Sequence, residues 1–285
     1  MRDLAEQRGG FMGACAGYDR ARVVLVGAPM DYTVSFRPGT RQGPDRIRSV
    51  SVGLEEYSMY LDRDLADYAY YDLGNVILPF GRVKESLRRI GEVAKDILAG
   101  GKIPLVLGGE HLVSLPVVEQ AAARYPGLAV IHFDAHADLR EDYLGERLSH
   151  ATVMRRVAEV VGGNNLYQFG IRSGTREELA YARGYTRFFP GEVAAPLAGV
   201  LHELKSRPVY VTLDIDVVDP AFAPGTGAPE PGGCSSSEII EAVHLLDGLQ
   251  VVGFDLVEVS PVYDASESTT LLAAKLVREA ILCFG

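Results

Sequence analysis

The chain has 285 residues, of which 47% are hydrophobic and 23% charged, a composition typical of a globular protein with a large core. Its 28 basic and 38 acidic residues give a net charge of −10, which argues against nucleic acid or an anionic membrane as a partner. Apolar runs are too short to span a bilayer, and the N-terminus lacks the apolar region of a signal peptide. The scattered Cys15, Cys234 and Cys283 indicate reduced thiols, so we expect a cytoplasmic protein.

Short apolar runs alternate with amphipathic segments along the whole chain. Strands are expected at 22–27, 68–72, 103–107, 128–134, 165–171, 186–189, 209–214 and 251–257. Helices are expected at 83–98, 112–125, 151–161, 176–183, 196–205, 236–246 and 267–283. This alternation predicts one α/β domain, residues 1–285, in which helices cover both faces of a mostly parallel sheet of about eight strands.

Two helix boundaries have recognisable local causes. The helix at 83–98 has its apolar residues on one face, and Gly100-Gly101 follows it as a stop. Ser235 followed by Glu238 predicts a capping box at the start of the helix at 236–246.

Acids or histidines follow several predicted strands. They are Asp72, Gly-Gly-Glu-His at 108–111, Asp-Ala-His-Ala-Asp at 134–138, Asp-Ile-Asp at 214–216 and Glu258. A hydrophobic core does not require polar residues at these positions. Because ligands of parallel sheets bind at the carboxyl ends of the strands, we predict the functional site there.

The spacing of Asp134, His136 and Asp138 predicts a metal site. Residues at every second position of an extended strand point to one side, so these three side chains converge. Without a partner, the two carboxylates would repel each other and lose hydration, whereas a cation would remove both costs. Asp214 and Asp216 repeat the spacing on another strand.

Together the candidate ligands comprise four carboxylates and two imidazoles. They are His111, Asp134, His136, Asp138, Asp214 and Asp216. Four carboxylates neutralise two divalent cations, and an oxygen-rich set without thiolates favours Mn²⁺ over Zn²⁺. Each residue alone has a structural explanation, as a hydrogen-bonded histidine or a turn aspartate. Two separate alternations that each end an apolar strand favour the metal site.

Eight sequence motifs resemble those of the ureohydrolases, the arginase/agmatinase family, and of its agmatinase branch in particular. They are Gly-Ala-Pro-Met-Asp at 27–31, Arg-Pro-Gly-Thr-Arg-Gln-Gly-Pro at 37–44, Gly-Gly-Glu-His at 108–111, Asp-Ala-His-Ala-Asp at 134–138, Ser-His-Ala-Thr at 149–152, Asp-Ile-Asp-Val-Val-Asp-Pro at 214–220, Pro-Gly-Thr-Gly at 224–227 and Gly-Phe-Asp-Leu-Val-Glu-Val-Ser-Pro at 253–261. They occur in the family's order and cover nearly the whole chain. The resemblance implies an arginase-like three-layer α-β-α fold with a metal site at the C-terminal strand ends.

The resemblance also implies a cofactor of two Mn²⁺ per subunit. One ion would be held by His111, Asp134, Asp138 and Asp214. The other would be held by Asp134, His136, Asp214 and Asp216, so that Asp134 and Asp214 bridge the two ions. A hydroxide between the metals would attack the guanidinium carbon and release urea and an amine.

Two further residues acquire roles from the resemblance. Glu258 would pair with the substrate guanidinium, a planar cation that a carboxylate can hold by two parallel hydrogen bonds. His150 would lie near the substrate and pass a proton to the leaving amine, although Ser149 before it also suits a helix cap. Asp138 would in addition orient the hydroxide proton. Glu110 stands where many relatives have Asp, and we expect little consequence because it is not a ligand.

The segment 139–148 bears on the substrate. It lacks the pattern with which arginases recognise an α-carboxylate, and its acids Glu141, Asp142 and Glu146 would attract an ammonium tail. Alternatively, these acids form a solvated loop without substrate contact.

We therefore expect an agmatinase, an enzyme that hydrolyses a small cationic guanidino substrate, agmatine, to putrescine and urea in polyamine synthesis. The alternatives are hydrolysis of guanidinobutyrate, aminopropylagmatine or arginine, a catalytically silent family member, and a two-metal phosphoesterase. By resemblance, we expect a homo-oligomer, a trimer or hexamer.

Overall fold

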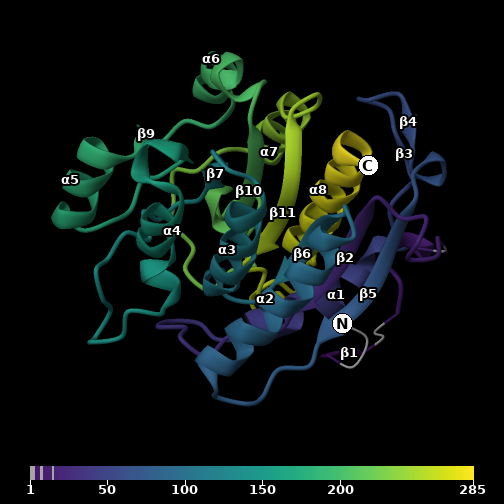
Figure 1. Ribbon diagram of the computed structural model, residues 1–285, viewed down its shortest axis with the longest axis horizontal. Helices are drawn as coiled ribbons and strands as arrows, with labels where there is room; N and C mark the ends of the chain where they lie inside the picture. Colours follow the sequence, from purple (N-terminus) through teal and green to yellow (C-terminus); the bar gives the residue numbers. More distant parts are fainter. Residues whose placement is uncertain (1–3, 7–8, 15) are drawn as a thin grey trace.

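The computed structural model describes residues 4–6, 9–14 and 16–285, and its centre is a nine-stranded sheet in the order β1-β5-β2-β6-β11-β10-β7-β8-β9 (Figure 1). The strands are β1 Ala5–Glu6, β2 Val23–Ala28, β5 Tyr70–Val76, β6 Ile103–Gly108, β7 Ala129–Phe133, β8 Leu166–Phe169, β9 Arg187–Phe189, β10 Pro208–Asp214 and β11 Gln250–Val257. Only β1 is antiparallel to its neighbour among these described strands. The short strands β3 (Tyr57–Ser58) and β4 (Arg63–Asp64) form a separate pair.

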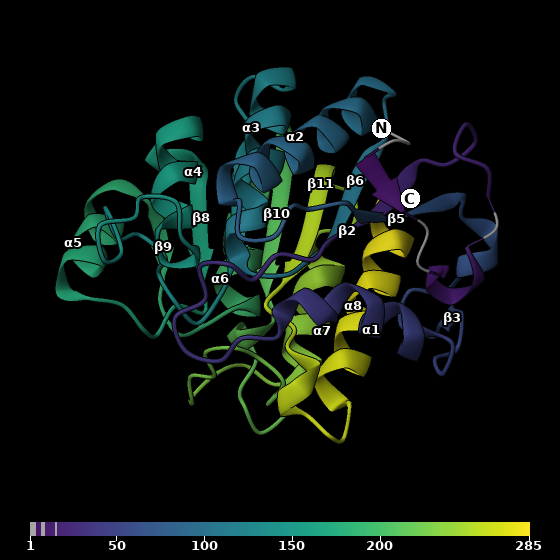
Figure 2. The same ribbon diagram turned by 90° about the horizontal axis from the view of Figure 1, so that it is seen from below.

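Helices cover both faces of the sheet (Figure 2). They are α1 Gly43–Ser51, α2 Val83–Ala99, α3 Ser114–Arg124, α4 Val153–Val161, α5 Arg176–Tyr185, α6 Ala194–Leu204, α7 Ser236–Leu245 and α8 Ser268–Phe284. The apolar side chains of α2, α3 and α4 form one core with one face of the sheet. Those of α1, α6, α7 and α8 form a second core on the opposite face. The predicted three-layer, mostly parallel architecture is therefore confirmed.

Each predicted strand and helix has a counterpart in the structure, with boundaries that differ by a few residues. Helix α1 was not predicted. It contributes only Ile47 and Val50 as large apolar residues to the core, and its buried face also includes Arg48. A face that buries an arginine does not show the apolar periodicity from which helices are predicted.

The two predicted helix boundaries have the expected causes. Helix α2 ends at Ala99 with Gly100 as its cap, and Gly101 adopts a φ of 70°, a left-handed conformation that glycine tolerates without strain. At the start of α7, Ser235 Oγ accepts the backbone N–H of Glu238 at 3.2 Å, so Ser235 caps the helix as predicted. Among the described hydrogen bonds, the return bond from the Ser235 N–H to the Glu238 side chain is absent, so the predicted capping box is only half formed.

The prediction that Asp72 lies at a strand end with the site residues is wrong. Strand β5 continues to Val76, so Asp72 lies inside the strand, and its side chain is buried. Arg48 of α1 binds both carboxylate oxygens, with Nε 2.8 Å from Oδ2 and Nη2 2.9 Å from Oδ1. Asp72 therefore joins α1 to the sheet and does not contribute to the site.

The register of the four central strands brings their carboxyl ends level. Strands β6, β11, β10 and β7 are consecutive neighbours in the sheet. Phe133 pairs with Leu213, Leu256 pairs with Leu107, and Asp214 pairs with Val257. The polar segments that follow these strands consequently meet at one edge, as the sequence predicts for a parallel sheet.

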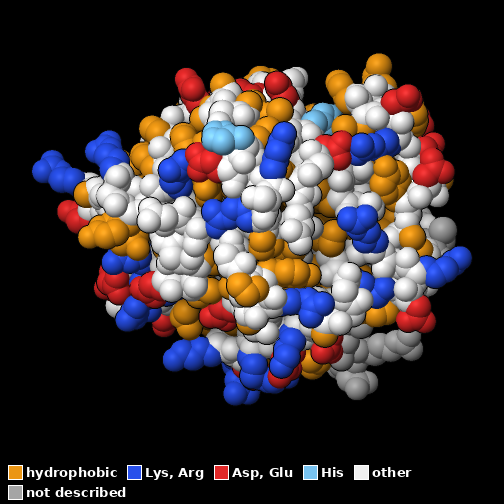
Figure 3. Space-filling view, turned by 45° about the horizontal axis from the view of Figure 1, so that its top comes forward, with side chains coloured by type: hydrophobic (Ala, Val, Ile, Leu, Met, Phe, Trp, Pro, Cys, Tyr) orange, Lys and Arg blue, Asp and Glu red, His pale blue; other side chains and the backbone are white. Residues whose placement is uncertain are grey.

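The remaining sequence expectations concern thiols and surfaces. Cys234 and Cys283 are free, and burial raises the pKa of each to about 12, while Cys15 lies outside the described residues. Within the described ranges, no helix combines the length and apolarity that crossing a bilayer needs. On the face drawn in Figure 3, basic, acidic and apolar side chains are interspersed.

Candidate active site

The six candidate metal ligands come together at the carboxyl ends of β6, β7 and β10. His111 begins a short 3-10 helix after β6, and Asp134, His136 and Asp138 follow β7. Asp214 is the last residue of β10, and Asp216 lies in the 3-10 turn Ile215–Val217. All are buried except His136, which is partly exposed. The sequence prediction that they converge is confirmed.

One half of this cluster surrounds the imidazole of His111. Its Nδ1 lies 3.1 Å from Asp134 Oδ2, 3.2 Å from Asp138 Oδ2 and 3.3 Å from Asp214 Oδ2. The same Nδ1 is buried and has no hydrogen-bond partner with acceptable geometry. A buried nitrogen that is equidistant from three carboxylates but bonded to none fits a ligand atom directed at a shared cation.

The other half surrounds His136. Its Nδ1 lies 2.9 Å from Asp216 Oδ2 and 3.5 Å from Asp134 Oδ1. Asp134 therefore presents Oδ2 to His111 and Oδ1 to His136. Asp214 also divides its oxygens, because Oδ2 is directed toward His111 while Oδ1 accepts the N–H of Asp216 at 2.9 Å. Asp134 thus connects the two halves of the cluster, an arrangement compatible with a site for two metal ions.

Burial and mutual repulsion dominate the electrostatics of the cluster. Burial raises the pKa of Asp138 to about 7 and raises the pKa values of Asp214 and Asp216. Burial alone would lower the pKa of His111, but the adjacent carboxylates, Asp134 first, raise it well above its usual value. Without a cation, the cluster therefore retains protons that solvated groups would lose, and a cation would take their place.

Two residues of the site have strained backbones. Asp138 has a φ of 52° and Glu258 has a φ of 63°, in the left-handed region that residues other than glycine rarely adopt. Such strain persists only where the surrounding structure fixes it, and it concentrates at functional sites.

Glu258 directly follows β11 and lies against the cluster. Its Oε1 accepts the backbone N–H of His111 at 2.8 Å, and its side chain is buried at the pocket floor. Burial raises its pKa to about 8, and the nearby carboxyl of Glu110 adds to the shift. A carboxylate held in this way can take a cationic partner from the pocket.

His150 lies in the wall opposite, where Ser149 caps the 3-10 helix His150–Thr152 as the sequence suggests. His150 also lines the pocket, so its place after the cap is compatible with the expected position near the substrate. Its Nε2 lies 3.1 Å from Ser35 Oγ, and its backbone N–H donates to Thr33 Oγ1 at 3.0 Å. Burial lowers its pKa to about 4, so it is neutral at pH 7.

These groups line a pocket of about 310 Å³, large enough for a small substrate. Its floor includes His136, Asp138, Asp214, Asp216 and Glu258. Its walls come from segments 34–36, 140–151, 173–178 and 227–228. The arrangement places candidate ligands, a carboxylate for a cation and a neutral histidine around one cavity.

Comparison with known proteins shows the family of this chain. The model of the arginase family matches residues 21–283. The chain belongs to the arginase family. It is 53% identical over 277 residues to the agmatinase of Bacillus subtilis (strain 168), a match that covers 96% of both chains. It is 35% identical to the guanidinobutyrase of Pseudomonas aeruginosa over 280 residues, 94% of this chain and 88% of that protein.

Solved structures agree with this assignment. The structure of a putative agmatinase from Clostridium difficile superimposes with a TM-score of 0.91 and 39% identity, and it covers 94% of this chain and 98% of its own. The predicted ureohydrolase family and arginase-like fold are thus confirmed, and the chain is an enzyme. The arginase family is a family of binuclear metal enzymes, and the donor set around His111 and His136 fits such a centre.

The acids of segment 139–148 do not have the predicted position in this arginase-family pocket. Of the described residues of this segment, Arg140 and Tyr143 line the pocket, whereas Glu141, Asp142 and Glu146 do not. Glu141 forms ion pairs with arginines of its surroundings, and the other two acids accept backbone N–H groups of their own loop. These positions favour the alternative, in which the three acids belong to a solvated loop without substrate contact.

Glu110 has a role that the sequence analysis did not predict. It is buried, and its Oε2 accepts both the N–H and the Oγ–H of Thr33 at 2.8 Å. Because Thr33 Oγ1 accepts the N–H of His150, Glu110 fixes the loop that contains Ser35 against that histidine. A Cβ on Gly109 would collide with the backbone of Met30, which gives the glycine before Glu110 a physical reason.

Proposed function

We propose that this enzyme is a manganese-dependent agmatinase, which hydrolyses agmatine to putrescine and urea. The observation that supports it most is a cluster of four carboxylates and two imidazoles, of which one imidazole and three carboxylates line the pocket, in a chain 53% identical to a protein named agmatinase. The donor set, rich in oxygen and without thiolates, suits Mn²⁺.

The ligand geometry suggests how two ions would be divided. His111, Asp134, Asp138 and Asp214 would hold one, and His136 and Asp216 would share Asp134 and Asp214 in holding the other. When bound, the metals would lower the pKa of a water molecule enough for it to attack the guanidinium carbon at neutral pH.

The residues of the chain would bind the substrate and move its protons. Glu258 would hold the planar guanidinium, with its Oε1 already fixed by the His111 N–H. His150, neutral at pH 7 and held by Thr33 and Ser35, would accept a proton released by the attacking group and pass it to the leaving amine. Asp138, whose strained backbone points its carboxylate into the cluster, would orient the attacking group.

The proposal extends to the protein's setting. Putrescine production would place the enzyme in polyamine synthesis in the cytoplasm. One nine-stranded sheet runs from β1 to β9, which supports a single catalytic domain over residues 1–285. By family resemblance, we propose that the chain forms a homo-oligomer, a trimer or hexamer. Analytical ultracentrifugation would distinguish the two.

A second candidate substrate is 4-guanidinobutyrate. Arg140 lines the pocket, and a positive charge there would attract a carboxylate tail. The similarity to a guanidinobutyrase points the same way. Glu178, with Oε2 3.7 Å from Arg140 Nε, offsets this charge, and the higher identity to agmatinase favours agmatine.

Parallel assays of urea release decide between these substrates. Purified protein loaded with Mn²⁺ is offered agmatine, 4-guanidinobutyrate and arginine, with chelator-treated protein as the control. We expect the highest kcat/KM for agmatine and no urea from the chelated sample. Preference for another guanidino compound would overturn the substrate and keep the reaction. No urea from any compound, with two metals bound, would overturn the proposed activity.

A further inference from the structure

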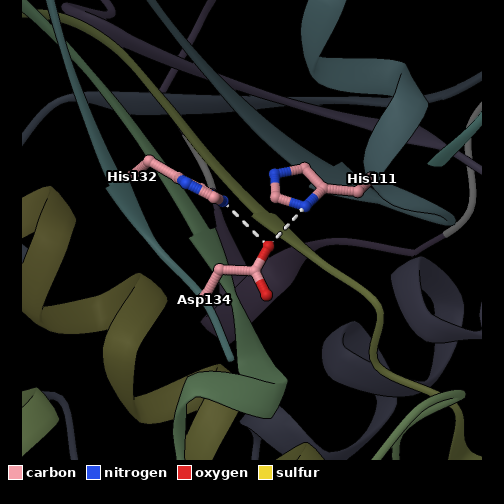
Figure 4. A group of neighbouring side chains, drawn as sticks. All are labelled: His111, His132 and Asp134. Atoms are coloured by element: carbon pink, nitrogen blue, oxygen red, sulfur yellow. Dashed lines mark hydrogen bonds and ion pairs between the residues drawn. The ribbon is translucent and has the colours of Figure 1, made fainter. Parts of the chain in front are cut away.

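A second imidazole contacts the carboxylate that is shared by the two halves of the cluster. His132 lies on β7, two residues before Asp134, and is completely buried. Its Nε2 lies 2.8 Å from Asp134 Oδ2, the same oxygen that faces His111 Nδ1 at 3.1 Å. Figure 4 shows the two rings approaching this oxygen from different sides. By position alone, His132 could be a metal ligand or a hydrogen-bond donor.

The neighbouring strand distinguishes these two roles. Gln168 of β8 pairs directly with His132 in the sheet. Its side-chain nitrogen donates to the carbonyl oxygen of Ala137 at 3.0 Å and lies 3.1 Å from His132 Nδ1. Since a carbonyl oxygen only accepts, the atom beside Ala137 must be the NH₂ group, and this fixes the orientation of the amide.

The orientation of Gln168 determines the tautomer of His132. An amide NH₂ only donates, so His132 Nδ1 must accept, and the ring hydrogen must lie on Nε2. That hydrogen points at Asp134 Oδ2. A nitrogen with its hydrogen in this position has no free lone pair for a metal.

From this geometry, we infer that His132 is a positioning residue, which donates from Nε2 to Asp134 Oδ2 in the tautomer imposed by Gln168. The inference rests on the proposed two-metal function, because its role is to aim the shared carboxylate at the cations. Partners of this kind orient metal ligands, and their loss weakens metal affinity about 10- to 100-fold. Since the bond is made to Oδ2, the ion beside His111 is the one most affected.

A matched pair of substitutions tests the donor role. His132→Gln keeps an N–H group near the position of Nε2, whereas His132→Met has similar length and no donor. Mn²⁺ binding to the metal-free full chain is measured by titration calorimetry, with circular dichroism to confirm the fold. We expect His132→Met to weaken the affinity for at least one Mn²⁺ about 10- to 100-fold. We expect His132→Gln to keep most of the wild-type affinity.

Two outcomes of the calorimetry would overturn the inference. Folded His132→Met protein that binds Mn²⁺ within about twofold of wild type would show that the bond does not position Asp134. Loss of one Mn²⁺ altogether in both variants would identify His132 as a ligand.

The tautomer is tested on the unchanged protein. In ¹⁵N-histidine NMR of the metal-free and zinc-loaded forms, the signal absent from His132→Met identifies His132. We expect the Nε2–H tautomer in both forms, and an Nδ1–H tautomer or an imidazolium would overturn the inference. Gln168→Glu replaces the donor at Nδ1 with an acceptor, so it should move the hydrogen to Nδ1 and weaken Mn²⁺ binding. None of these measurements uses a substrate, so failure to hydrolyse agmatine would leave their outcome intact.

Discussion

Two regions of the same sheet bury carboxylates and differ in what neutralises them. In β5, Asp72 binds the guanidinium of Arg48 through both oxygens, at 2.8 and 2.9 Å. The backbone N–H groups of Phe11 and Gly74 each donate to it at 3.0 Å. The protein itself supplies the cation and the hydrogen bonds that this buried charge needs.

At the ends of β7 and β10, the compensation is of another kind. Within the described part of the chain, Asp134, Asp138, Asp214 and Asp216 form ion pairs with histidines and with no lysine or arginine. Four clustered acids without a permanent protein cation require protons or metal ions. A single buried acid in a strand thus does not by itself indicate a metal site, whereas a cluster of four buried acids that lacks a protein cation fits one.

The largest expected effect comes from removing the shared carboxylate. Asp134→Asn keeps the size of the side chain but removes the charge that faces the imidazoles of His111 and His136. We expect loss of both metals and a fall in urea release on the order of a thousandfold or more. Metal content by mass spectrometry and turnover of agmatine check this. Retention of two metals would contradict the bridging assignment.

Glu258→Gln is the matched control for this change. It also neutralises one buried carboxylate of the pocket, but we place Glu258 on the substrate. It should retain two Mn²⁺ and lose turnover by about 100- to 1000-fold, since the guanidinium loses its counter-charge. Metal loss in this variant would show that Glu258 helps to hold the ions.

A change at the other region should affect stability and leave the metals in place. Arg48→Met leaves Asp72 as a buried charge without its cation, which costs about 3 to 5 kcal/mol of unfolding free energy. Thermal and urea unfolding measure the loss, and metal analysis of the folded protein should still find both ions. Loss of metal at full stability would mean that the two regions are coupled.

The pH dependence of the metal-free protein offers a finer test. Burial raises the pKa of Asp138 and of Glu110 to about 7 and that of Glu258 to about 8. With pKa values above those of the unfolded chain, the folded state binds more protons, so stability must fall as pH rises through this range. The lowered pKa values of His150 and His132 act in the opposite direction, but only below their ordinary value of 6.5.

From pH ~6.5 to ~8, we therefore expect the unfolding free energy of the chelated protein to fall. The fall is up to about 1.4 kcal/mol per pH unit for each proton that the folded chain binds and the unfolded chain does not. Melting curves in EDTA at several pH values measure this slope. Mn²⁺ should reduce it, because the cations replace the protons at Asp138. An equal slope with and without Mn²⁺ would mean that the protonated acids lie outside the metal site.

The sequence predicts the floor of the site because its geometry follows from local rules. The carboxyl ends of parallel strands share an edge, so the segments that contain His111, Asp134 and Asp214 must meet. The predicted alternation along an extended strand is wrong, because β7 ends at Phe133 and Asp138 has a left-handed backbone, so the irregular segment after the strand brings Asp134 and Asp138 together. The same rules predict the strands and most helices. They also misplace Asp72, since the length of β5 and its contact with Arg48 of an unpredicted helix are not local properties.

The walls and supports of the site depend on contacts between distant residues. Glu110 and Thr33 are 77 positions apart, and His132 and Gln168 are 36 apart. No spacing rule connects such pairs, because loop conformation and strand order decide which side chains meet. Charge counts fail for the same reason, as they do not show which arginine neutralises which acid.

The smallest expected effect comes from removing an acid that nearby arginines neutralise outside the pocket. Glu141 is exposed and makes ion pairs at 3.1 Å with Arg147 and Arg155, outside the pocket. Exposed pairs of this kind contribute about 0 to 1 kcal/mol, so Glu141→Gln should change the KM for agmatine by less than about twofold. Tyr143→Leu, a change in a residue of the same loop that lines the pocket, should raise KM more. A large KM increase in Glu141→Gln would restore the acidic segment as a determinant of substrate choice.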